Sequence, residues 1–169
     1  MLLTKSLCLH HSPEAVIQDA ARAGAECIQI REKDMPSDEL HDLPINIARS
    51  ILGPRAIIGR SCSNTDQLRE AFDQGADYCG LGPVFPSTTK QKSNLGGIQM
   101  LTDAMADSEL QTKPMLAISG ITPQNIDQIA ATGFPGVAVS STVCSSEDPY
   151  AACLAIVESM QHAASSSKC

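Results

Sequence analysis

The sequence predicts an α/β protein built from parallel strand–helix units. Three similar passages lead from a helix end through glycine into an apolar run: AGAECIQI at 23–30, QGADYCGLG at 74–82 and TGFPGVAVS at 132–140. Continuous apolar runs are typical of parallel strands that are buried on both faces. Glycine commonly ends a helix because it adopts the left-handed conformation. Each passage therefore indicates a helix-to-strand connection.

Six strands, each followed by a helix, are expected along the chain. The strands are predicted at 2–4, 27–30, 56–60, 78–84, 115–119 and 137–140. Helices are predicted over about 13–23, 66–74, 123–132 and 148–162, where Ser12 with Pro13, Asn64 or Thr65, and Thr122 with Pro123 provide capping and first-turn residues. We therefore expect one domain over 1–163 and a frayed tail over 164–169.

The composition favours a core that needs no covalent support. A chain of 169 residues can bury enough surface to fold as one domain without disulfides or metals. Because aromatic residues make up 3% and tryptophan is absent, the core must consist of Ile, Leu, Val and Ala. The seven cysteines are odd in number and include no CxxC pair, which predicts reduced thiols. Cys27 and Cys79 lie in apolar runs, where cysteine acts as a small hydrophobe.

The charge balance argues against two classes of partner. A net charge of −7 disfavours a general nucleic-acid surface, which needs an excess of Lys and Arg. No apolar run is long enough to span a bilayer, and the first residues do not resemble a signal peptide. We therefore expect a cytoplasmic protein. A bound polyanion must meet a local group of cations, for which Arg31, Lys33, Lys90 and Lys92 are the candidates.

Polar or glycine residues follow the predicted strands. They are Arg31, Glu32 and Lys33, then Ser61, then Gly82 with the loop 86–92, then Ser119 and Gly120, and finally Ser140 and Ser141. In parallel strand–helix folds, functional groups gather where the strands end. The sequence therefore predicts one site assembled from several strand ends.

Two of these segments carry residues that suit phosphate. In IQIREKD at 28–34, Arg31 offers a planar fork that can bind phosphate with two hydrogen bonds, and Lys33 adds a point charge. GLGPVFPSTTKQK at 80–92 combines hydroxyl groups, a lysine and two glycines that could let the backbone approach a ligand. A solvated surface loop is the alternative for each segment alone. The spacing does not match the P-loop nucleotide motif.

Two further segments lead from a strand towards a helix, AISGITPQN at 117–125 and VAVSST at 137–142. Free amides at a helix start bind anions, so two adjacent starts would suit one phosphate. Ordinary capping by Thr122 and Ser141 is the alternative. His10, His11 and His162 show no zinc-ligand spacing and are interpreted as structural or exposed. No Ser–His–Asp arrangement is evident.

Taken in series, IQIREKD, LGPRAIIGRS, GADYCGLGPVFPSTTK, LAISGITPQN and GVAVSSTV resemble the thiamine-phosphate synthase family. The resemblance runs from Leu2 to Val143 and implies a (β/α)8 barrel of the TIM type. It implies a transferase that joins a pyrimidine diphosphate to a thiazole phosphate with Mg²⁺ and releases diphosphate. In that reaction diphosphate leaves, and the thiazole nitrogen captures the pyrimidine-methyl cation. Thiazole tautomerase, a related branch with the same fold, is a second candidate.

The resemblance also implies roles for individual residues. Catalytic cations that stabilise the departing diphosphate are Arg31, Lys33 and Lys90. Substrate contacts carry over to Gln29, Arg31, Lys33, Ser61 and Lys90 for the pyrimidine diphosphate, and to Ser87, Thr89, Gly120, Ser140 and Ser141 for the thiazole phosphate, with Ile30, Glu32 and Thr88 completing the set.

One segment of the family pattern is absent between Asp34 and Asp42. There the family has a strand with an Asn-Asp metal motif and a further strand, whereas 35–41 is too short to hold them. Asp42 matches the second metal aspartate, so it is the one expected Mg²⁺ ligand. We therefore expect a barrel truncated to about six βα units, incomplete or distorted, with open edges that favour a homo-oligomer.

The absent segment leaves a third functional reading open, namely a catalytically impaired relative that only binds phosphate. Ser119 is a smaller departure, because the family usually has glycine there. A serine at that position would be strained if the backbone requires a positive φ.

Overall fold

In the computed structural model of the chain, the described residues are 2–3, 8–25, 29–30, 45, 54–55, 57–87 and 96–166. They contain the six strands β1 (Leu2–Leu3), β2 (Gln29–Ile30), β3 (Gly59–Cys62), β4 (Tyr78–Leu81), β5 (Met115–Ile118) and β6 (Val137–Ala138). β1 pairs in parallel with β2, and β3, β4, β5 and β6 form a second parallel sheet in that order. The predicted parallel α/β fold is confirmed.

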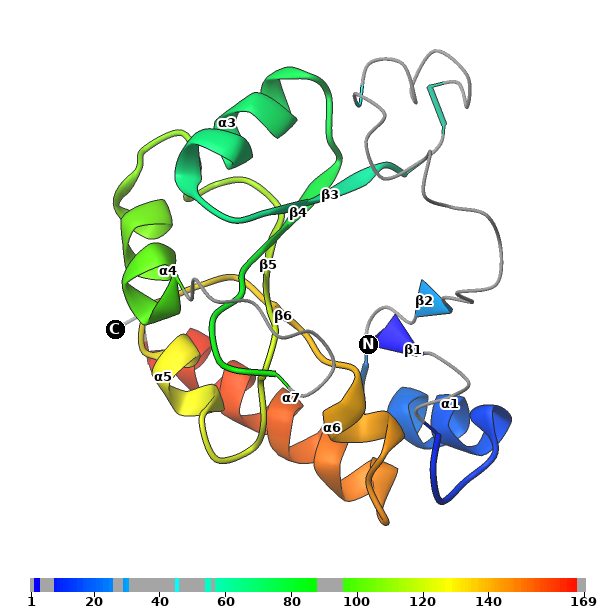
Figure 1. Cartoon of the computed structure of the whole chain (residues 1–169). Coiled ribbons are helices and arrows are strands. Elements are labelled where there is room, and N and C mark those ends of the chain that lie inside the picture. The colour runs from blue at the N-terminus through cyan, green and yellow to red at the C-terminus, as the bar shows by residue number, and fades with distance from the viewer. Residues whose placement is uncertain are drawn as a thin grey trace.

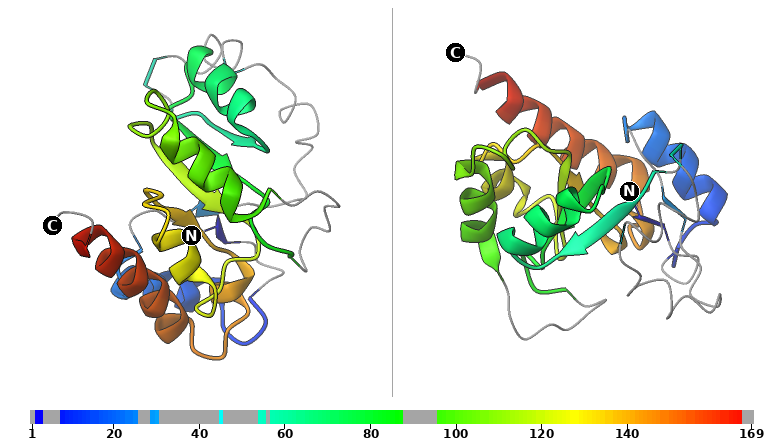
Figure 2. Two further views of the ribbon diagram at one scale, coloured as in Figure 1. Left: turned by 90° about the vertical axis from the view of Figure 1, so that its left-hand side faces the viewer. Right: turned by 90° about the horizontal axis from the view of Figure 1, so that it is seen from above.

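The helices are α1 (Pro13–Arg22), α3 (Thr65–Asp73), α4 (Gly97–Ala106), α5 (Ile126–Ala130), α6 (Ser141–Cys144) and α7 (Pro149–Ser166). Figure 1 shows α3, α4 and α5 in succession along one side of the four-stranded sheet. α7 packs against α1, α5 and α6, so it joins the first helix to the last strand–helix unit. The left view in Figure 2 shows the strands behind this layer of helices.

Two helices begin where the capping residues predict. The Ser12 side chain accepts a hydrogen bond from the Ala15 amide, 3.2 Å away, at the start of α1. The Asn64 side chain accepts one from the Gln67 amide at 2.8 Å, at the start of α3. Each side chain satisfies an amide that has no partner within the first helical turn.

Other boundaries differ from the prediction. α5 covers Ile126–Ala130 instead of 123–132, because a turn occupies the residues before it. β3 begins at Gly59 instead of 56, and Ile57 before it is 81% exposed. α7 continues to Ser166, three residues into the segment predicted as a frayed tail, where alanine and serine follow the predicted helix end at 162. α4 was not predicted as a separate helix, since Gly96 and Gly97 begin it and no side chain caps it.

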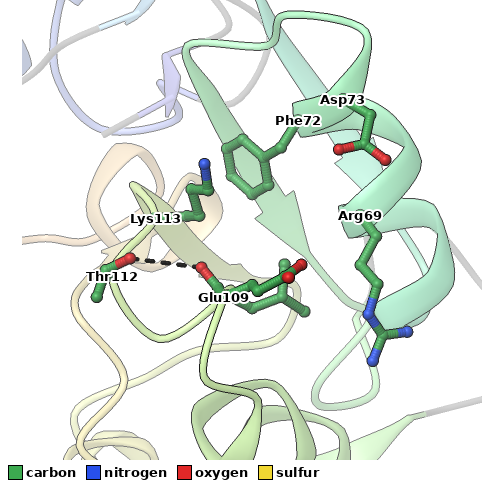
Figure 3. A pocket seen from close by; sticks show the side chains of 7 residues that line it. Arg69, Phe72, Asp73, Glu109, Thr112 and Lys113 are labelled. Carbon is green, nitrogen blue, oxygen red and sulfur yellow. Dashed lines mark hydrogen bonds between the residues drawn. The ribbon is translucent and has the colours of Figure 1, made fainter.

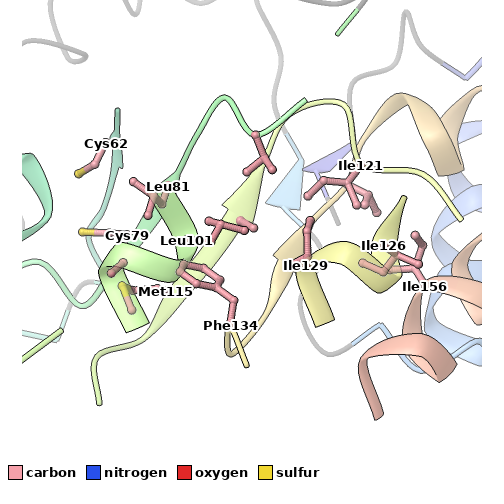
Figure 4. Packing of buried hydrophobic residues seen from close by; sticks show 14 of the residues in the cluster. Cys62, Cys79, Leu81, Leu101, Met115, Ile121, Ile126, Ile129, Phe134 and Ile156 are labelled. Atoms are coloured by element: carbon pink, nitrogen blue, oxygen red, sulfur yellow. The ribbon is translucent and has the colours of Figure 1, made fainter. Parts of the chain in front are cut away.

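The core lies between the four-stranded sheet and its helices. Cys79 pairs in register with Met115, and Leu81 with Ala117, so all four side chains share one face. They are at most 2% exposed and belong to one cluster with Leu101, as Figure 4 shows. On the other face of β5 the alternate residues are only half-buried. β5 is therefore buried more completely on the helix side, whereas in β4 the successive residues Cys79, Gly80 and Leu81 are all buried, as its apolar run predicted.

The cysteines of the described part, Cys8, Cys62, Cys79, Cys144 and Cys153, are free thiols. Cys62 and Cys79 lie on neighbouring strands with their sulfur atoms on the same side (Figure 4). A hydrogen bond to the Cys62 sulfur, together with burial, raises the pKa of Cys79. This thiol therefore stays protonated and packs as a small hydrophobe, as predicted; Cys27 lies outside the described residues. None of the described helices is long and apolar enough to cross a bilayer.

Candidate phosphate site at the strand ends

The segment that follows β4 runs along the end of β5. The Val84 amide donates a hydrogen bond to the Ile118 carbonyl at 3.1 Å, and the Phe85 amide donates to the Ser119 carbonyl at 3.2 Å. In the reverse direction, the Ser119 hydroxyl donates to the Phe85 carbonyl at 3.2 Å. These three bonds extend the contact between β4 and β5 beyond the sheet. They bring the segment 82–87, with Ser87 at its end, to the same rim as Ser119.

Two glycines make this close approach possible. A Cβ atom on Gly82 would lie 2.4 Å from the Ile118 carbonyl oxygen, and one on Gly120 would lie 2.3 Å from the Pro86 carbonyl oxygen. Real Cβ atoms do not approach backbone so closely, so any larger residue must push the segments apart. From the sequence, Gly80 and Gly82 are expected to make room for a ligand. The structure shows that they make room for Ile118 on the neighbouring strand.

A tight turn follows β5. Ser119 and Gly120 have positive φ angles of 83° and 67°. The Asn125 side chain closes the turn, because its Oδ1 accepts from the Thr122 amide and its Nδ2 donates to the Gly120 carbonyl, both at 2.9 Å. Within the described residues, neither the Gly120 amide nor the Ile121 amide donates a hydrogen bond. The predicted helix start at Thr122 is therefore wrong, and the free amides belong to a turn.

The end of β6 lies beside this turn. Ile118 pairs in register with Ala138, so Gly120 and Ser140 follow their strands at the same level. The Ser140 hydroxyl is buried and has no hydrogen-bond partner among the described residues. The Thr142 hydroxyl donates to the Ile121 carbonyl and ties the two strand ends together. An unsatisfied buried hydroxyl costs about 1–3 kcal/mol, so its presence here indicates a place for a polar ligand.

Ser61 lies at a different place from the one predicted. It is an exposed residue inside β3, in register with Gly80, whereas the predicted strand 56–60 ends before it. The structure therefore brings Gly120 and Ser140 together on adjacent strand ends, with Ser141 next to them at the start of α6. Ser61 is two strands away from Gly120 in the sheet order.

Comparison with known proteins identifies the family. The family model described as thiamine monophosphate synthase matches residues 39–143, which include β3, β4, β5 and β6. The chain belongs to the thiamine monophosphate synthase family. The match contains Gly120 and Ser140, but the segment Gln29–Lys33 lies outside it.

Relatives of the family agree with this assignment. The thiamine-phosphate synthase of Salinibacter ruber is 43% identical over 109 residues, which cover 64% of this chain and 47% of that protein. The thiamine-phosphate synthase 2 of Streptococcus pneumoniae is 29% identical over 173 residues, covering 79% of this chain and 81% of that protein. The chain spans about half the length of the first curated relatives it matches, with 47% and 53% of two of them covered.

A solved structure has the same fold. Thiamine phosphate pyrophosphorylase from Pyrococcus furiosus superposes with a TM-score of 0.80 at 24% identity, over 96% of this chain and 95% of that one. With the parallel sheet order, this likeness confirms the predicted truncated barrel of the TIM type.

Many of the predicted site residues lie outside the described residues. They are Arg31, Glu32, Lys33, Asp42, Thr88, Thr89 and Lys90, and only the backbone of Gln29 and Ile30 is described, in β2. Their roles stay predictions. The His11 ring lies 2.7 Å from the Glu147 carbonyl oxygen, and the His162 ring lies 2.7 Å from that of Glu158. Contacts with backbone carbonyls support the structural interpretation of both histidines.

Two residues that hold this site in place, Asn125 and Thr142, were not predicted from the sequence. Asn125 closes the turn after β5, and Thr142 ties that turn to α6. A signal for Asn125 was present, because asparagine commonly hydrogen-bonds nearby backbone and so replaces a helical turn. Nothing local marked Thr142, since its partner Ile121 is 21 residues away in sequence.

A second hollow lies at the opposite, amino end of the strands. It is a cavity of about 300 Å³ between α3 and the loop before β5, lined by Arg69, Phe72, Asp73, Glu109, Leu110, Thr112 and Lys113 (Figure 3). Arg69 is paired with Asp107 at 2.6 Å and with Asp66 at 2.7 Å. The Lys113 ammonium lies over the Phe72 ring, 5.6 Å from its centre. Because Arg69 and Lys113 both have partners within the protein, we interpret them as structural residues of this cavity.

The Asp107 carboxylate stabilises this loop. Its Oδ1 accepts hydrogen bonds from the amides of Leu110 and Glu109, and its Oδ2 accepts from the Arg69 guanidinium. The Leu110 amide, the Arg69 guanidinium and the Glu109 amide together lower the pKa of Asp107. The charged carboxylate is therefore the form that the fold favours.

Proposed function

We propose that this chain is a transferase of thiamine biosynthesis. It condenses 4-amino-2-methyl-5-(diphosphomethyl)pyrimidine with thiazole phosphate and gives thiamine phosphate and diphosphate. The observation that carries the proposal is the Ser140 hydroxyl, which is buried beside the Gly120 turn and has no partner in the part of the chain that the structure describes. Family membership supplies the reaction, and a phosphate ester is the kind of ligand that backbone amides and hydroxyls at such a strand end bind.

The thiazole phosphate is placed between the ends of β5 and β6. Two backbone amides, those of Gly120 and Ile121, are available there to donate hydrogen bonds to phosphate oxygens. The Ser140 hydroxyl donates a third, and Ser141 starts the next helix on the same rim. Ser87 completes the proposed subsite from the segment after β4.

The chemistry is a displacement in which charge develops on the leaving group. The bond between the pyrimidine methylene carbon and the diphosphate oxygen breaks, and the oxygen keeps the electron pair. The thiazole nitrogen then shares its lone pair with the methylene carbon, which forms the new C–N bond. Cations near the departing oxygens lower the barrier, because the charge there is greatest in the transition state. We propose Arg31, Lys33 and Lys90 for that role.

Magnesium is a separate proposal. The resemblance implies Mg²⁺ with Asp42 as a ligand, but the part of the chain that the structure describes contains no group of three His, Cys, Asp or Glu side chains able to hold a metal ion. These residues alone therefore do not fit an ion, and no step of the reaction is assigned to it. Titration of Mg²⁺ against the wild type and Asp42→Asn tests whether Asp42 binds the metal.

The net charge and the open strand edges bear on which macromolecules the chain binds. The net charge of −7 argues against a nucleic-acid partner. We propose small-molecule substrates and a cytoplasmic location. Among the described strands, β3 pairs only with β4, and β2 only with β1. Because open strand edges favour association between chains, we propose a homo-oligomer. Sedimentation that gives a monomer at micromolar concentration contradicts it.

The reaction is tested directly with the purified 169-residue chain. Both substrates are supplied with Mg²⁺, and thiamine phosphate and diphosphate are measured together by chromatography. Equal amounts of the two products are expected, at a rate far below that of a version in which the family's missing segment is restored between Asp34 and Asp42. Equal turnover by the two versions would refute the importance of the segment.

Other outcomes separate the alternatives. Phosphate binding without product formation identifies an impaired relative, and isomerisation of the thiazole without the pyrimidine substrate identifies a tautomerase. Lys90→Ala is expected to weaken binding of the pyrimidine diphosphate. Lys113→Ala is the matched control, because Lys113 lies at the amino end of β5 and its removal should leave that binding unchanged. Equal binding by wild type and Lys90→Ala contradicts the assigned role.

A further inference from the structure

Asn125 occupies the position of a helix cap but does not cap its helix. It directly precedes α5, yet its side chain makes no capping hydrogen bond to that helix. The amide group instead turns back, where it accepts from the Thr122 amide and donates to the Gly120 carbonyl. Asn64 stands at the same place before α3, and there the side chain does cap the helix through Gln67. The two asparagines therefore have different tasks.

The contact with Gly120 fixes the direction of one peptide group. In a trans peptide the carbonyl and the following N–H point in opposite directions. Because Asn125 holds the Gly120 carbonyl, the Ile121 N–H must point away from Asn125. The Ile121 carbonyl is in turn held by Thr142. The peptide groups before and after Ile121 are thus both held, directly after Gly120 with its φ of 67°.

We infer that Asn125 is a positioning residue that aims the Ile121 amide at a bound phosphate group. It does so without a contact of its own to the ligand. The inference rests on the proposed phosphate subsite, whose donors are the Gly120 amide, the Ile121 amide and the Ser140 hydroxyl. A glycine has many accessible conformations, so without the Asn125 contact the turn loses the orientation that suits the anion.

Inorganic phosphate is the probe that tests this role. It is titrated into the wild type, Asn125→Ala, Asn125→Ser and Asn64→Ala, and dissociation constants are measured by calorimetry. Asn125→Ala is expected to raise the dissociation constant about tenfold, the effect of losing roughly one aimed hydrogen bond. Asn64→Ala is expected to stay within about twofold, although both alanine variants lose a hydrogen bond at the start of a helix and become less stable.

Asn125→Ser separates positioning from folding. A serine hydroxyl can still accept from the Thr122 amide and close the turn, but it is too short to hold the Gly120 carbonyl. This variant should fold normally and bind phosphate weakly. In NMR spectra its Ile121 amide signal should no longer respond to phosphate, while the signals of the core stay as in the wild type.

The outcomes distinguish this inference from the proposed reaction. Wild-type affinity in both Asn125 variants, or an equal loss in Asn64→Ala, overturns the positioning role. Phosphate binding that depends on Asn125 in a chain that forms no thiamine phosphate supports the inference and refutes the proposed reaction. Thiamine phosphate formation with the same KM for thiazole phosphate in Asn125→Ser refutes the inference alone. If the wild type binds no phosphate, both are wrong.

Discussion

Ser119 offers a test of two opposing effects at a single position. Its φ of 83° lies in the left-handed region, where a residue with a Cβ atom costs about 1–2 kcal/mol relative to glycine. Its hydroxyl also donates to the Phe85 carbonyl at 3.2 Å, and such a bond contributes about 0.5–1.5 kcal/mol. Serine therefore combines a backbone cost with a side-chain gain. Glycine and alanine substitutions separate the two.

The two variants should differ in their free energy of unfolding. Ser119→Ala keeps the backbone strain and loses the hydrogen bond, so it should be about 1 kcal/mol less stable than the wild type. Ser119→Gly loses the same bond but relieves the strain, and glycine adds about 0.5–1 kcal/mol of chain entropy to the unfolded state. The sum leaves Ser119→Gly within about 1 kcal/mol of the wild type and above Ser119→Ala.

Urea unfolding, followed by circular dichroism, measures these differences if the slopes against urea are equal. The order wild type, then Ser119→Gly, then Ser119→Ala is expected, with the first two close together. If Ser119→Ala equals or exceeds Ser119→Gly in stability, the argument from backbone strain is wrong. Wild-type stability in Ser119→Ala would instead show that the bond to Phe85 contributes nothing.

Three further substitutions test other parts of the molecule. Leu101→Ala removes a side chain that is 0% exposed, so the free energy of unfolding should fall by about 2–5 kcal/mol in the same urea assay; a loss well below this range contradicts the assigned core. Gly82→Ala should destabilise the fold and weaken phosphate binding together, because its Cβ would meet the Ile118 carbonyl at 2.4 Å; a change in only one of these counts against the close contact. Asp107→Asn should lower stability at neutral pH. Because the pKa of Asp107 is lowered in the fold, its contribution is present above the ordinary Asp value of about 3.9 and is lost as the pH falls through the folded pKa. The wild type and this variant should therefore converge in acid, and a constant difference from pH 7 to pH 2 argues against the charged interaction.

The sequence alone predicted six strands along the chain and the helices with clear caps. Ser12 and Asn64 begin α1 and α3 as expected, because a side-chain cap is a local interaction that its own residue specifies. The helix predicted over 123–132 was too long, since the Asn125 side chain closes a turn that competes with the first helical residues. α4 was missed because glycines stand at its start, and its stability comes from burial of Met100, Leu101 and Ala104.

For the site, the sequence predicted which strand ends carry donors but not how they are held. Gly120 and Ser140 could be placed on one rim because parallel strands end at the same edge. The bonds that fix this rim join segments far apart in the chain, such as Ser119 with Phe85, 34 residues away. Such contacts depend on register, which periodicity does not give. For the same reason the sequence suggested that Gly82 lets the backbone approach a ligand, whereas it lets the backbone approach Ile118.

The ion pairs of Arg69 lie at the end of the strands remote from the Gly120 turn. A fluorophore or surface tether attached to Glu109 or Lys113, both exposed beside that network, would leave the opposite rim open to small molecules. Different substrate solutions could then be passed over the immobilised chains in a flow cell. Affinity for each compound could be read from one oriented layer of protein.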